Sequence, residues 1–414
     1  MNIVTPLVSI GIPVWRGSAY VGDAVRSVLE QPSDSLELVV SVDPSDHESR
    51  DVLAKFQDPR MRVVHSPVQF GMAQHYEWCL QHLTGEWVTL LGQDDGLMFD
   101  FTHKLYDLFR RFPDAAAFSF RRAYYFWPGC ESTYGDRGVL VRAGCSERLV
   151  VGSQAISKSI SGLLPHYDFP QIYTNGLVRN QVVQEIRAIS GGVFYHDMTP
   201  DVYSGYVIAQ HLDTFVRVDY PAFWTGTSPA STGLAITRSQ SGDSDSVSES
   251  IRSHHLASAQ RSGLGTSAVV GRELWLESRS SAIYAVSALE SSPLTRKGVP
   301  KSADYEEAFA ALTAQLLLSF LPAFPPRRHK LRTWSLMRDR ATSSGLRVRR
   351  IVMRVPLLLL RHCGSRFADL WRDRGPSTCL SVSVPQGSIG SICEANDWLH
   401  LYLSEMDTNS RKLN

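Results

Sequence analysis

Residues 7–30 read LVSIGIPVWRGSAYVGDAVRSVLE, and two different periodicities follow one another in this stretch. The first part, Leu7–Val14, is rich in β-branched residues and is typical of a strand. In the second part, apolar residues such as Val21, Ala24 and Val25 recur at helical spacing. The stretch therefore predicts a strand followed by a helix, the unit from which parallel sheets are built.

The same alternation continues through roughly the first 120 residues. Further β-rich or apolar runs lie at 36–42, 61–65, 86–92 and 115–120. Helices are predicted between them, one after Ser45 and Asp46, either of which can cap it, and one entered through Gly71. Repeated strand–helix units predict an α/β fold, with a mostly parallel sheet covered by helices on both faces.

The composition is that of an ordinary globular chain. The 414 residues are 43% hydrophobic and 20% charged, which is enough for about two or three domains. Lysine and arginine number 42 against 41 aspartates and glutamates, so the net charge of +1 gives no indication of a nucleic-acid partner. The six cysteines lie far apart without a Cys-x-x-Cys pair, which argues against a disulfide framework or a zinc site and fits a reducing cytoplasm.

Changes in composition divide the chain into four predicted segments. Residues 1–130 form the strand–helix core, and 131–236 are irregular and rich in aromatics, glycine and proline, as expected of a substrate-facing region built largely from loops. The serine-rich tract 237–250 is predicted to be a linker, and 251–414 a mostly helical region.

The C-terminal region raises the question of membrane contact. The longest uncharged run, Ala308–Phe324, is too short to span a bilayer and predicts a buried or interfacial helix. In the segment 327–374, arginines far outnumber acids and alternate with aliphatic residues, and Pro356 is expected to break any single long helix. This segment either lies on an anionic membrane surface or forms the solvated basic face of a packed helical region.

Acidic residues follow two of the predicted strands. Asp43 comes after the second strand, and Asp94 and Asp95 after the fourth. In parallel sheets ligands bind at the carboxyl ends of the strands, so these acids are expected at the rim of a cleft. Two adjacent carboxylates repel each other unless a cation or hydrogen bonds offset their charge, and a hard divalent ion is one such partner. Taken alone, an Asp-Asp-Gly after a strand is often only a turn.

Three blocks of the sequence together resemble a known enzyme family. PLVSIGIPVWRGSAYVGDAVRSVLEQ (6–31), LELVVSVDPSDHES (36–49) and FGMAQHYEWCLQHLTGEWVTLLGQDDG (70–96) are similar to successive blocks of inverting family 2 glycosyltransferases with the GT-A fold, of the kind that builds surface polysaccharides. A looser resemblance extends through GGVFYHDMTPDVYSGYVIA (191–209) to about residue 235. The resemblance implies transfer of a sugar from a nucleotide diphosphate donor to an acceptor hydroxyl, with inversion at the anomeric carbon.

The resemblance also implies roles for residues on the donor side. Asp95 would bind Mg²⁺ or Mn²⁺, which stabilises the charge of the leaving diphosphate. Asp94 would help hold the ribose or the waters of the metal, Asp43 would accept a hydrogen bond from the base, and Pro13 would lie against the nucleotide. Val42 stands where relatives often carry another acid. The donor is expected to be a UDP-sugar.

The acceptor side requires a base, because the acceptor hydroxyl must lose its proton as it attacks. Asp201 is the first candidate and Asp197 the second, since relatives place their base about a hundred residues beyond the Asp pair. Pro200 favours an exposed turn that would present Asp201. The aromatic run Tyr124–Trp127 either stacks on an acceptor sugar or packs in the core.

The expected protein is therefore a metal-dependent, hexosyltransferase-like enzyme acting on a glycan or lipid-linked acceptor. No Gln-x-x-Arg-Trp occurs, which by resemblance indicates a non-processive enzyme. It is expected in the cytoplasm, either free or attached peripherally to the inner face of the cell membrane. The alternative is a non-catalytic, sugar- or membrane-binding scaffold that kept the fold. A nucleotidyltransferase would need a glycine-rich phosphate loop, which GIPVWRGSAY (11–20) lacks.

Overall fold

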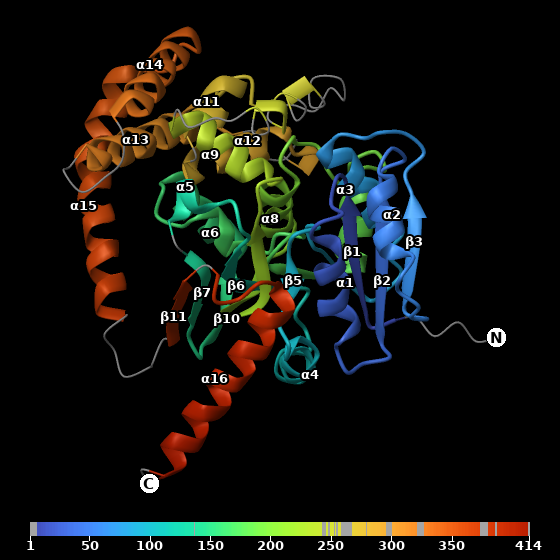
Figure 1. The fold of residues 1–414 in the computed structure, drawn as a ribbon. Coiled ribbons are helices and arrows are strands. Elements are labelled where there is room, and N and C mark those ends of the chain that lie inside the picture. The colour runs from blue at the N-terminus through green and yellow to red at the C-terminus, as the bar shows by residue number, and fades with distance from the viewer. Residues whose placement is uncertain are drawn as a thin grey trace.

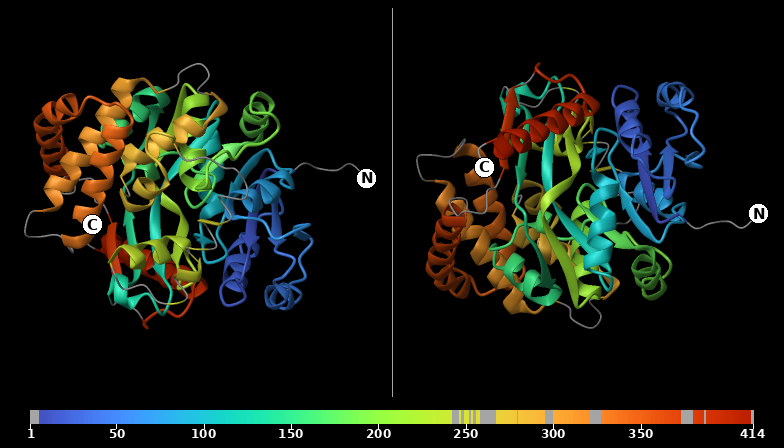
Figure 2. Two further views of the ribbon diagram at one scale, coloured as in Figure 1. Left: turned by 90° about the horizontal axis from the view of Figure 1, so that it is seen from above. Right: turned by 90° about the horizontal axis from the view of Figure 1, so that it is seen from below.

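A computed structural model describes residues 6–412 except 136, 242–245, 247–248, 252, 254–255, 258–266, 279, 295–299, 321–326, 373–379 and 386. The strand–helix core occupies one side of the molecule, and the helices of the C-terminal half occupy the other (Figures 1 and 2). A single sheet includes the strands of the core and extends toward the helical region, in the order β11 (Leu380–Pro385), β7 (Arg137–Ala143), β6 (Ala117–Phe126), β9 (Gly176–Arg179), β4 (Trp87–Leu90), β1 (Val8–Val14), β2 (Leu36–Val42) and β3 (Met61–His65).

The N-terminal part of this sheet is parallel, as predicted. Strand β1 pairs in parallel with β2 on one side and β4 on the other, and β2 pairs with β3. The bounds are β1 (Val8–Val14), β2 (Leu36–Val42), β3 (Met61–His65) and β4 (Trp87–Leu90). The helices between them are α1 (Val21–Leu29), α2 (His47–Leu53) and α3 (Met72–Gln81). The predicted starts are confirmed: Asp46 caps α2 by accepting from the Ser49 amide at 3.1 Å, and Gly71 is the N-cap of α3.

Helices cover both faces of the sheet, because alternate side chains of each strand point to opposite sides. On β2, Val39 packs in the cluster formed with α3, α7 (Asn180–Ile189) and α8 (Pro200–His211), whereas Leu38 and Val40 pack in the cluster formed with α1 and α4 (Phe101–Arg111). All three valine and leucine side chains are fully buried. The predicted α/β fold class is therefore confirmed.

Residues 131–227 are more regular than predicted. Where loops were expected, the chain forms α5 (Glu131–Tyr134), β7 (Arg137–Ala143), β8 (Glu147–Val151), α6 (Gly152–Ile160), the 3₁₀ turn η1 (His166–Asp168), β9 (Gly176–Arg179), α7 (Asn180–Ile189), α8 (Pro200–His211) and β10 (Thr214–Thr227). Most strands here pair antiparallel, and β10 also pairs with β6 (Ala117–Phe126) in parallel and with β5 (Gly96–Leu97). Their partners are distant in sequence, so their short, mixed patterns read locally as loops.

The helical region shares its core with the sheet domain. Its elements are α9 (Thr232–Ser241), α11 (Arg272–Ser278), α12 (Ser281–Ser291), α13 (Ser302–Ser319), α14 (Arg327–Ser343) and α15 (Val348–Arg372). Ile283 and Val286 of α12 are fully buried in the same cluster as Tyr206 of α8. Helix α9 continues into the predicted linker, much of which lies outside the described residues, so the division at 237–250 stays a prediction.

The end of the chain returns to the sheet, which the prediction of a helical region up to residue 414 did not include. Strand β11 (Leu380–Pro385) pairs antiparallel with β7, and α16 (Ile392–Lys412) packs against α1. Asn396 of α16 accepts a hydrogen bond from Trp224 Nε1 at 2.7 Å and donates to Leu97 O at 3.0 Å. The last strand and helix therefore belong to the sheet domain (Figure 1).

Two predictions about the C-terminal helices have different outcomes. The run from Ala308 lies in α13 and is largely buried as far as Leu316, whereas Leu317 and Phe320 are each 43% exposed and 321–324 lie outside the described residues. Pro356, in contrast, does not end a helix: α15 continues through it. Proline has no amide hydrogen, so the carbonyl of Val352, four residues earlier, lacks its helical hydrogen bond. Val352 is 54% exposed and lies on the outer side of the helix. Within the described part of the chain, no helix has the length and apolar character needed to cross a membrane.

Candidate active site

A cavity of about 410 Å³ opens at the carboxyl ends of β1 and β4. Residues from several elements line it, among them Pro13 of β1, Gly71 before α3, Asp94 after β4, Asp201 of α8, Thr225 of β10 and Tyr284 of α12. Among the described residues that line it, Asp94 and Asp201 are the carboxylates and Arg122 is the one arginine or lysine. The predicted position at the carboxyl edge of the sheet is confirmed for Asp94.

The two adjacent acids face different surroundings. Asp94 lines the cavity and accepts hydrogen bonds from the hydroxyls of Ser228 at 2.6 Å and Ser231 at 2.7 Å. Asp95 has no exposed surface and accepts from the backbone amides of Gly92 at 2.7 Å and Gly226 at 2.6 Å. Asp95 is therefore an anchor between the loop after β4 and strand β10.

Strand β10 approaches this loop so closely that it needs glycine. A Cβ atom added to Gly226 would lie 1.6 Å from the carbonyl oxygen of Asp94, which no side chain tolerates. The close approach brings the Gly226 amide to Asp95 and the Ser228 hydroxyl to Asp94. The acid pair is thus fixed by residues more than 130 positions further along the chain.

The environment of the pair disfavours two negative charges. Burial raises the pKa of Asp94, and burial together with the charge of Asp94 raises the pKa of Asp95. The hydroxyl and amide donors oppose this shift but do not cancel it. A proton or a bound cation is therefore needed to offset one of the two charges.

A divalent cation fits this arrangement, with Asp94 as the carboxylate that faces the cavity. Asp95 stays the predicted main ligand, although it does not itself line the cavity and each of its oxygens already accepts a hydrogen bond from a backbone amide. No group of three His, Cys, Asp or Glu side chains is assembled for an ion within the described part of the chain. Mg²⁺ in nucleotide sites is commonly held by one or two carboxylates, phosphate oxygens and water, so such a group is not required.

Asp201 and Asp197, the two candidates for the base, are separated by the start of α8. Asp201 lies in the first turn of α8, half-buried, and lines the cavity, so the predicted exposed turn is in fact a helix N-terminus. Burial raises the pKa of Asp201, and the positive charge of Arg122 lowers it. The same side chain, Arg122, also lowers the pKa of Asp95.

Asp197 serves a structural purpose. Its carboxylate is 1% exposed and accepts from the Thr199 amide at 3.1 Å, the Thr199 hydroxyl at 3.0 Å and the Ser291 hydroxyl at 3.0 Å. It ties the start of α8 to α12 and is not among the described residues that line the cavity. Burial raises its pKa to about 6.

Of the two remaining donor-side candidates, one lines the cavity and the other does not. Pro13 lines the cavity, whereas Asp43 is 1% exposed and accepts from the Ser45 amide at 2.9 Å, in a turn at the end of β2. Beside it, His75 hydrogen-bonds the Ser41 hydroxyl at 2.9 Å and lines the cavity. Burial lowers the pKa of His75 to about 4, so the ring is neutral near pH 7.

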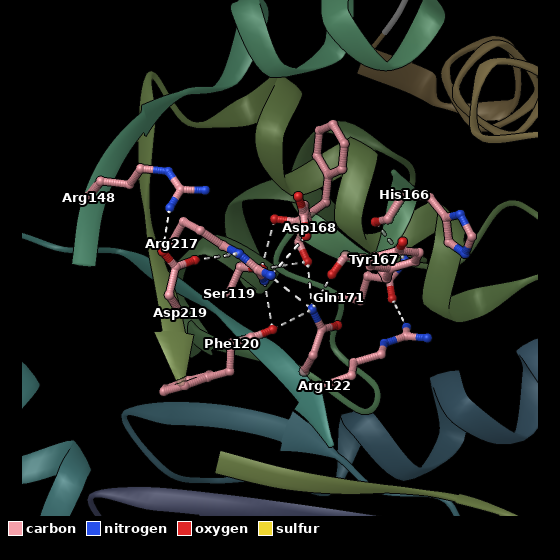
Figure 3. Close-up of polar contacts among 12 residues, drawn as sticks. Ser119, Phe120, Arg122, Arg148, His166, Tyr167, Asp168, Gln171, Arg217 and Asp219 are labelled. Carbon is pink, nitrogen blue, oxygen red and sulfur yellow. Dashed lines mark hydrogen bonds and ion pairs between the residues drawn. The ribbon is translucent and has the colours of Figure 1, made fainter. Parts of the chain in front are cut away.

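Arg122 is a cavity residue that the sequence did not single out. It lies on β6, where it donates a hydrogen bond to Gln171 Oε1, and its guanidinium sits 5.8 Å from the ring of Tyr167. Gln171 is itself buried and donates to His166 O at 3.2 Å (Figure 3). None of the described carboxylates lies within ion-pair distance of Arg122, so its charge remains directed at the cavity.

A neighbouring arginine shows the contrasting, structural arrangement. Arg217 of β10 is 5% exposed, pairs with Asp168 at 2.8 Å and donates to Ser119 Oγ at 3.0 Å and Phe120 O at 2.7 Å. In Figure 3, the Arg217 guanidinium lies in the middle of this cluster, whereas Arg122 lies at its margin. The cluster fixes the segment 166–171 against the sheet and so sets the position of Arg122.

Aromatic side chains from two parts of the chain form the far end of the cavity. His166, Trp275 and Tyr284 line it, with ring centroids 5.0 Å apart for His166 and Tyr284 and 5.1 Å for Trp275 and Tyr284. The run Tyr124–Trp127, in contrast, is largely core, since Tyr125 is fully buried and Trp127 is 5% exposed. No local signal in the sequence associates residues 275 and 284 with residue 166.

A comparison with protein families identifies the first third of the chain. Residues 9–139 match the sequence model described as glycosyl transferase family 2. The matched segment includes Pro13, Asp43, Asp94, Asp95 and Arg122. Asp201 and the helical region lie beyond it.

Curated relatives align over the same part of the chain. A putative teichuronic acid biosynthesis glycosyltransferase, TuaG of Bacillus subtilis, is 33% identical over 92 residues, which are 22% of this chain and 36% of that protein. Glycosyltransferase GlyG of Streptococcus pneumoniae is 27% identical over 105 residues, which are 25% of this chain and 35% of that protein. The chain therefore spans about a third of the length of these curated relatives.

Solved structures align over a larger share at low identity. TarS residues 1–349 of S. aureus, in complex with UDP-GlcNAc, aligns with a TM-score of 0.44 and 11% identity, covering 82% of this chain and 92% of that one. The mannosyltransferase PcManGT of Pyrobaculum calidifontis, in complex with GDP-Man and Mn²⁺, aligns with a TM-score of 0.39 and 14% identity, covering 90% of this chain and 89% of that one.

Proposed function

Residues 9–139 of this chain belong to glycosyl transferase family 2, and from that membership we propose that the protein transfers a sugar from a nucleotide diphosphate donor to an acceptor hydroxyl. One observation carries the proposal. Two carboxylates from distant parts of the chain line one cavity, Asp94 on the loop after β4 and Asp201 at the start of α8, and the two halves of this reaction each require one.

The donor half is assigned to the wall that contains Asp94 and Pro13. A Mg²⁺ or Mn²⁺ ion held by Asp94 and the donor phosphates would stabilise the negative charge of the leaving diphosphate. The hydroxyls of Ser228 and Ser231 hold the Asp94 carboxylate in place, and Asp95 fixes the loop by its two amide contacts. The nucleotide would lie toward Pro13, with Asp43 as the proposed contact to the base and a UDP-sugar as the preferred donor.

The acceptor half is assigned to the wall that contains Asp201. A carboxylate facing the acceptor removes the proton of the attacking hydroxyl, and attack from the side opposite the diphosphate inverts the anomeric carbon. Arg122 lowers the pKa of Asp201 and thereby keeps more of this carboxylate ionised despite its burial. His166, Trp275 and Tyr284 offer aromatic faces on which an acceptor sugar can stack.

The acceptor is proposed to be a glycan or a lipid-linked glycan of a surface polysaccharide. Support comes from TuaG, whose name places it in teichuronic acid biosynthesis. A hexosyl donor, non-processive transfer and a peripheral position at the cytoplasmic face of the membrane belong to the same proposal. A non-catalytic scaffold that binds sugars or membranes remains the alternative function, and it predicts binding without turnover.

Hydrolysis of donor sugars tests the proposal without knowledge of the acceptor. UDP- and GDP-sugars are incubated with the full chain and Mn²⁺, with and without chelator, and the released nucleotide diphosphate is measured. We expect hydrolysis that chelator abolishes, loss of it in Asp94→Asn, and no change in Asp51→Asn, which alters an exposed acid of α2. Nucleotide binding without any release would favour the scaffold, and hydrolysis unaffected by Asp94→Asn would contradict the metal assignment.

A further inference from the structure

Helix α15 lies at the outer edge of the helical region (Figures 1 and 2). Its inner side packs against α13 and is buried at Ile351, Val355 and Leu358, with exposures of 3%, 6% and 1%. These residues recur at helical spacing and account for the attachment of α15 to the protein. They do not account for the opposite side of the helix.

The outer side of α15 carries a second apolar face. Met353 is 79% exposed, Leu360 72%, Val352 54% and Leu357 52%, and Pro356 between them is also exposed. At this spacing the five side chains form one continuous surface, about 12 Å long at 1.5 Å per residue. We call Val352, Met353, Pro356, Leu357 and Leu360 the α15 stripe.

Arginines lie at both ends of the α15 stripe. Arg349 and Arg350 precede it and Arg361 follows it, and all three are exposed. No acidic residue occurs between positions 340 and 368. The acids nearest to α15, Glu306 and Glu307 of α13, lie on its inner side, where Glu307 pairs with Arg354 at 3.2 Å and Glu306 lies 4.0 Å from Arg350. The outer side is therefore apolar along its centre and positive at its ends.

This combination distinguishes the two functions that the sequence left open for segment 327–374. A solvated basic face would expose arginines and bury the aliphatic residues, whereas here Met353 and Leu360 are among the most exposed apolar side chains described. Isolated exposed leucines are common, but a continuous apolar surface bordered by charge marks an interaction site. An apolar face with basic margins is the arrangement by which helices lie in the surface of an anionic bilayer.

We infer that α15 docks the protein on an anionic lipid surface, with the α15 stripe inserted among the lipid chains and Arg349, Arg350 and Arg361 at the headgroups. A second copy of the chain fits this surface less well. A symmetric contact through the stripe would bring the arginine ends of one copy close to those of the other, and like charges at such distances repel. The anionic headgroups of a membrane supply an opposite charge for Arg349 and Arg361, for which the described residues provide no ion pair, and compete with Glu306 for Arg350.

The inference goes beyond the proposed transfer reaction and does not depend on it. A lipid-linked acceptor would be met at the same surface, but membrane docking is measured without donor or acceptor. Failure of vesicle binding with intact donor hydrolysis would remove this inference and the peripheral membrane position but leave the proposed transfer reaction, and the converse result would remove the transfer reaction alone.

Vesicle flotation with the full chain tests docking. Vesicles of phosphatidylcholine alone are compared with vesicles in which about a third of the lipid is phosphatidylglycerol. We expect the wild type to float with the anionic vesicles and not with the neutral ones, with binding that falls as salt is added. Met353→Glu and Leu360→Glu each place a charge in the stripe and are expected to lower the fraction bound at least tenfold. Arg349→Gln combined with Arg361→Gln should lower it several-fold.

A matched control separates the stripe from exposed apolar residues in general. Leu149 is 64% exposed on β8, in the sheet domain, so Leu149→Glu is expected to leave vesicle binding unchanged. Helix content and melting temperature are measured for every variant, and α15 variants should melt as the wild type does. The inference is overturned if the wild type ignores anionic vesicles, binds neutral ones equally well, or loses binding equally in Leu149→Glu. It is also overturned if light scattering shows a dimer that Leu360→Glu dissociates while vesicle binding persists.

Discussion

Asp197 and Asp201 lie four residues apart, on either side of the start of α8, and have opposite environments. Asp197 is 1% exposed and its carboxylate is occupied by Thr199 and Ser291. Asp201, one turn later, faces the cavity together with Arg122. Asp94 and Asp95 repeat the contrast at the end of β4, since one faces the cavity and the other is anchored to backbone amides. In each pair, the segments of the protein that pack around the two acids determine which acid is available for chemistry.

The largest effect is expected from removing the base. Asp201→Asn keeps the shape of the side chain but cannot accept the proton of the acceptor, so the rate of transfer should fall by about 10²- to 10⁴-fold. Binding of the metal–nucleotide complex, measured by calorimetry, should be unchanged because the proposed donor contacts come from β1 and the loop after β4, not from α8. Full transfer activity in Asp201→Asn would show that Asp201 is not the base and would remove the proposed difference between Asp201 and Asp197.

The acid pair after β4 gives the next largest effect. Asp94→Asn should weaken Mn²⁺-dependent nucleotide binding by about 10-fold or more, because a charged ligand is lost from the wall of the cavity. Asp95→Asn should mainly lower stability, by about 1–3 kcal/mol, because the amide group presents a donor to the Gly92 or Gly226 amide. Calorimetric titration and thermal unfolding of both variants measure the two effects, and reversed effects would assign the metal to Asp95.

Asp197→Ala sharpens the first comparison from the structural side. The substitution leaves the Thr199 amide and three hydroxyls without their acceptor in a buried place, so the free energy of unfolding should fall by about 1–3 kcal/mol. Transfer per folded molecule should be retained. Denaturant unfolding together with activity measured well below the melting temperature separates the two. Loss of transfer without loss of stability would assign a chemical role to Asp197.

The smallest effect is a shift in pH dependence. Burial raises the pKa of Asp201, so the active carboxylate is lost as the pH falls through a value above the ordinary one for aspartate. Arg122 lowers this pKa, so Arg122→Gln should move the acidic limb of the kcat/KM profile to higher pH, while Arg122→Lys should move it less. Arg121→Gln, which changes the next residue on β6 and thus the other face of the strand, is the matched control. An unchanged pH profile in Arg122→Gln would show that Arg122 does not control the pKa of the base.

Part of this site could be predicted and part could not. The strand-ending acids were expected at the carboxyl edge because alternating strand and helix patterns fix the direction of parallel strands. Asp95 as the ligand stays a prediction, but its contacts could not be foreseen, because the amides that hold it come from Gly92 and from Gly226, 131 residues further along. Arg122 could not be predicted as a cavity residue, since the sequence does not show whether an arginine within a strand faces a cavity or solvent. Asp43, expected at the nucleotide base, lies in a turn with Ser45 beside the cavity.

The sequence by itself determined the parallel core of β1 to β4 and the position of an acid pair at its carboxyl edge, because side-chain periodicity and strand-ending turns are local properties of the chain. Only the tertiary structure decided which acid of each pair faces the cavity, that Tyr284 of the helical region closes it, and that β11 and α16 return to the sheet. These features depend on contacts between segments from tens to hundreds of residues apart. The same holds for the outer face of α15, since an apolar stripe is known to be exposed only when the rest of the chain has packed on the other side.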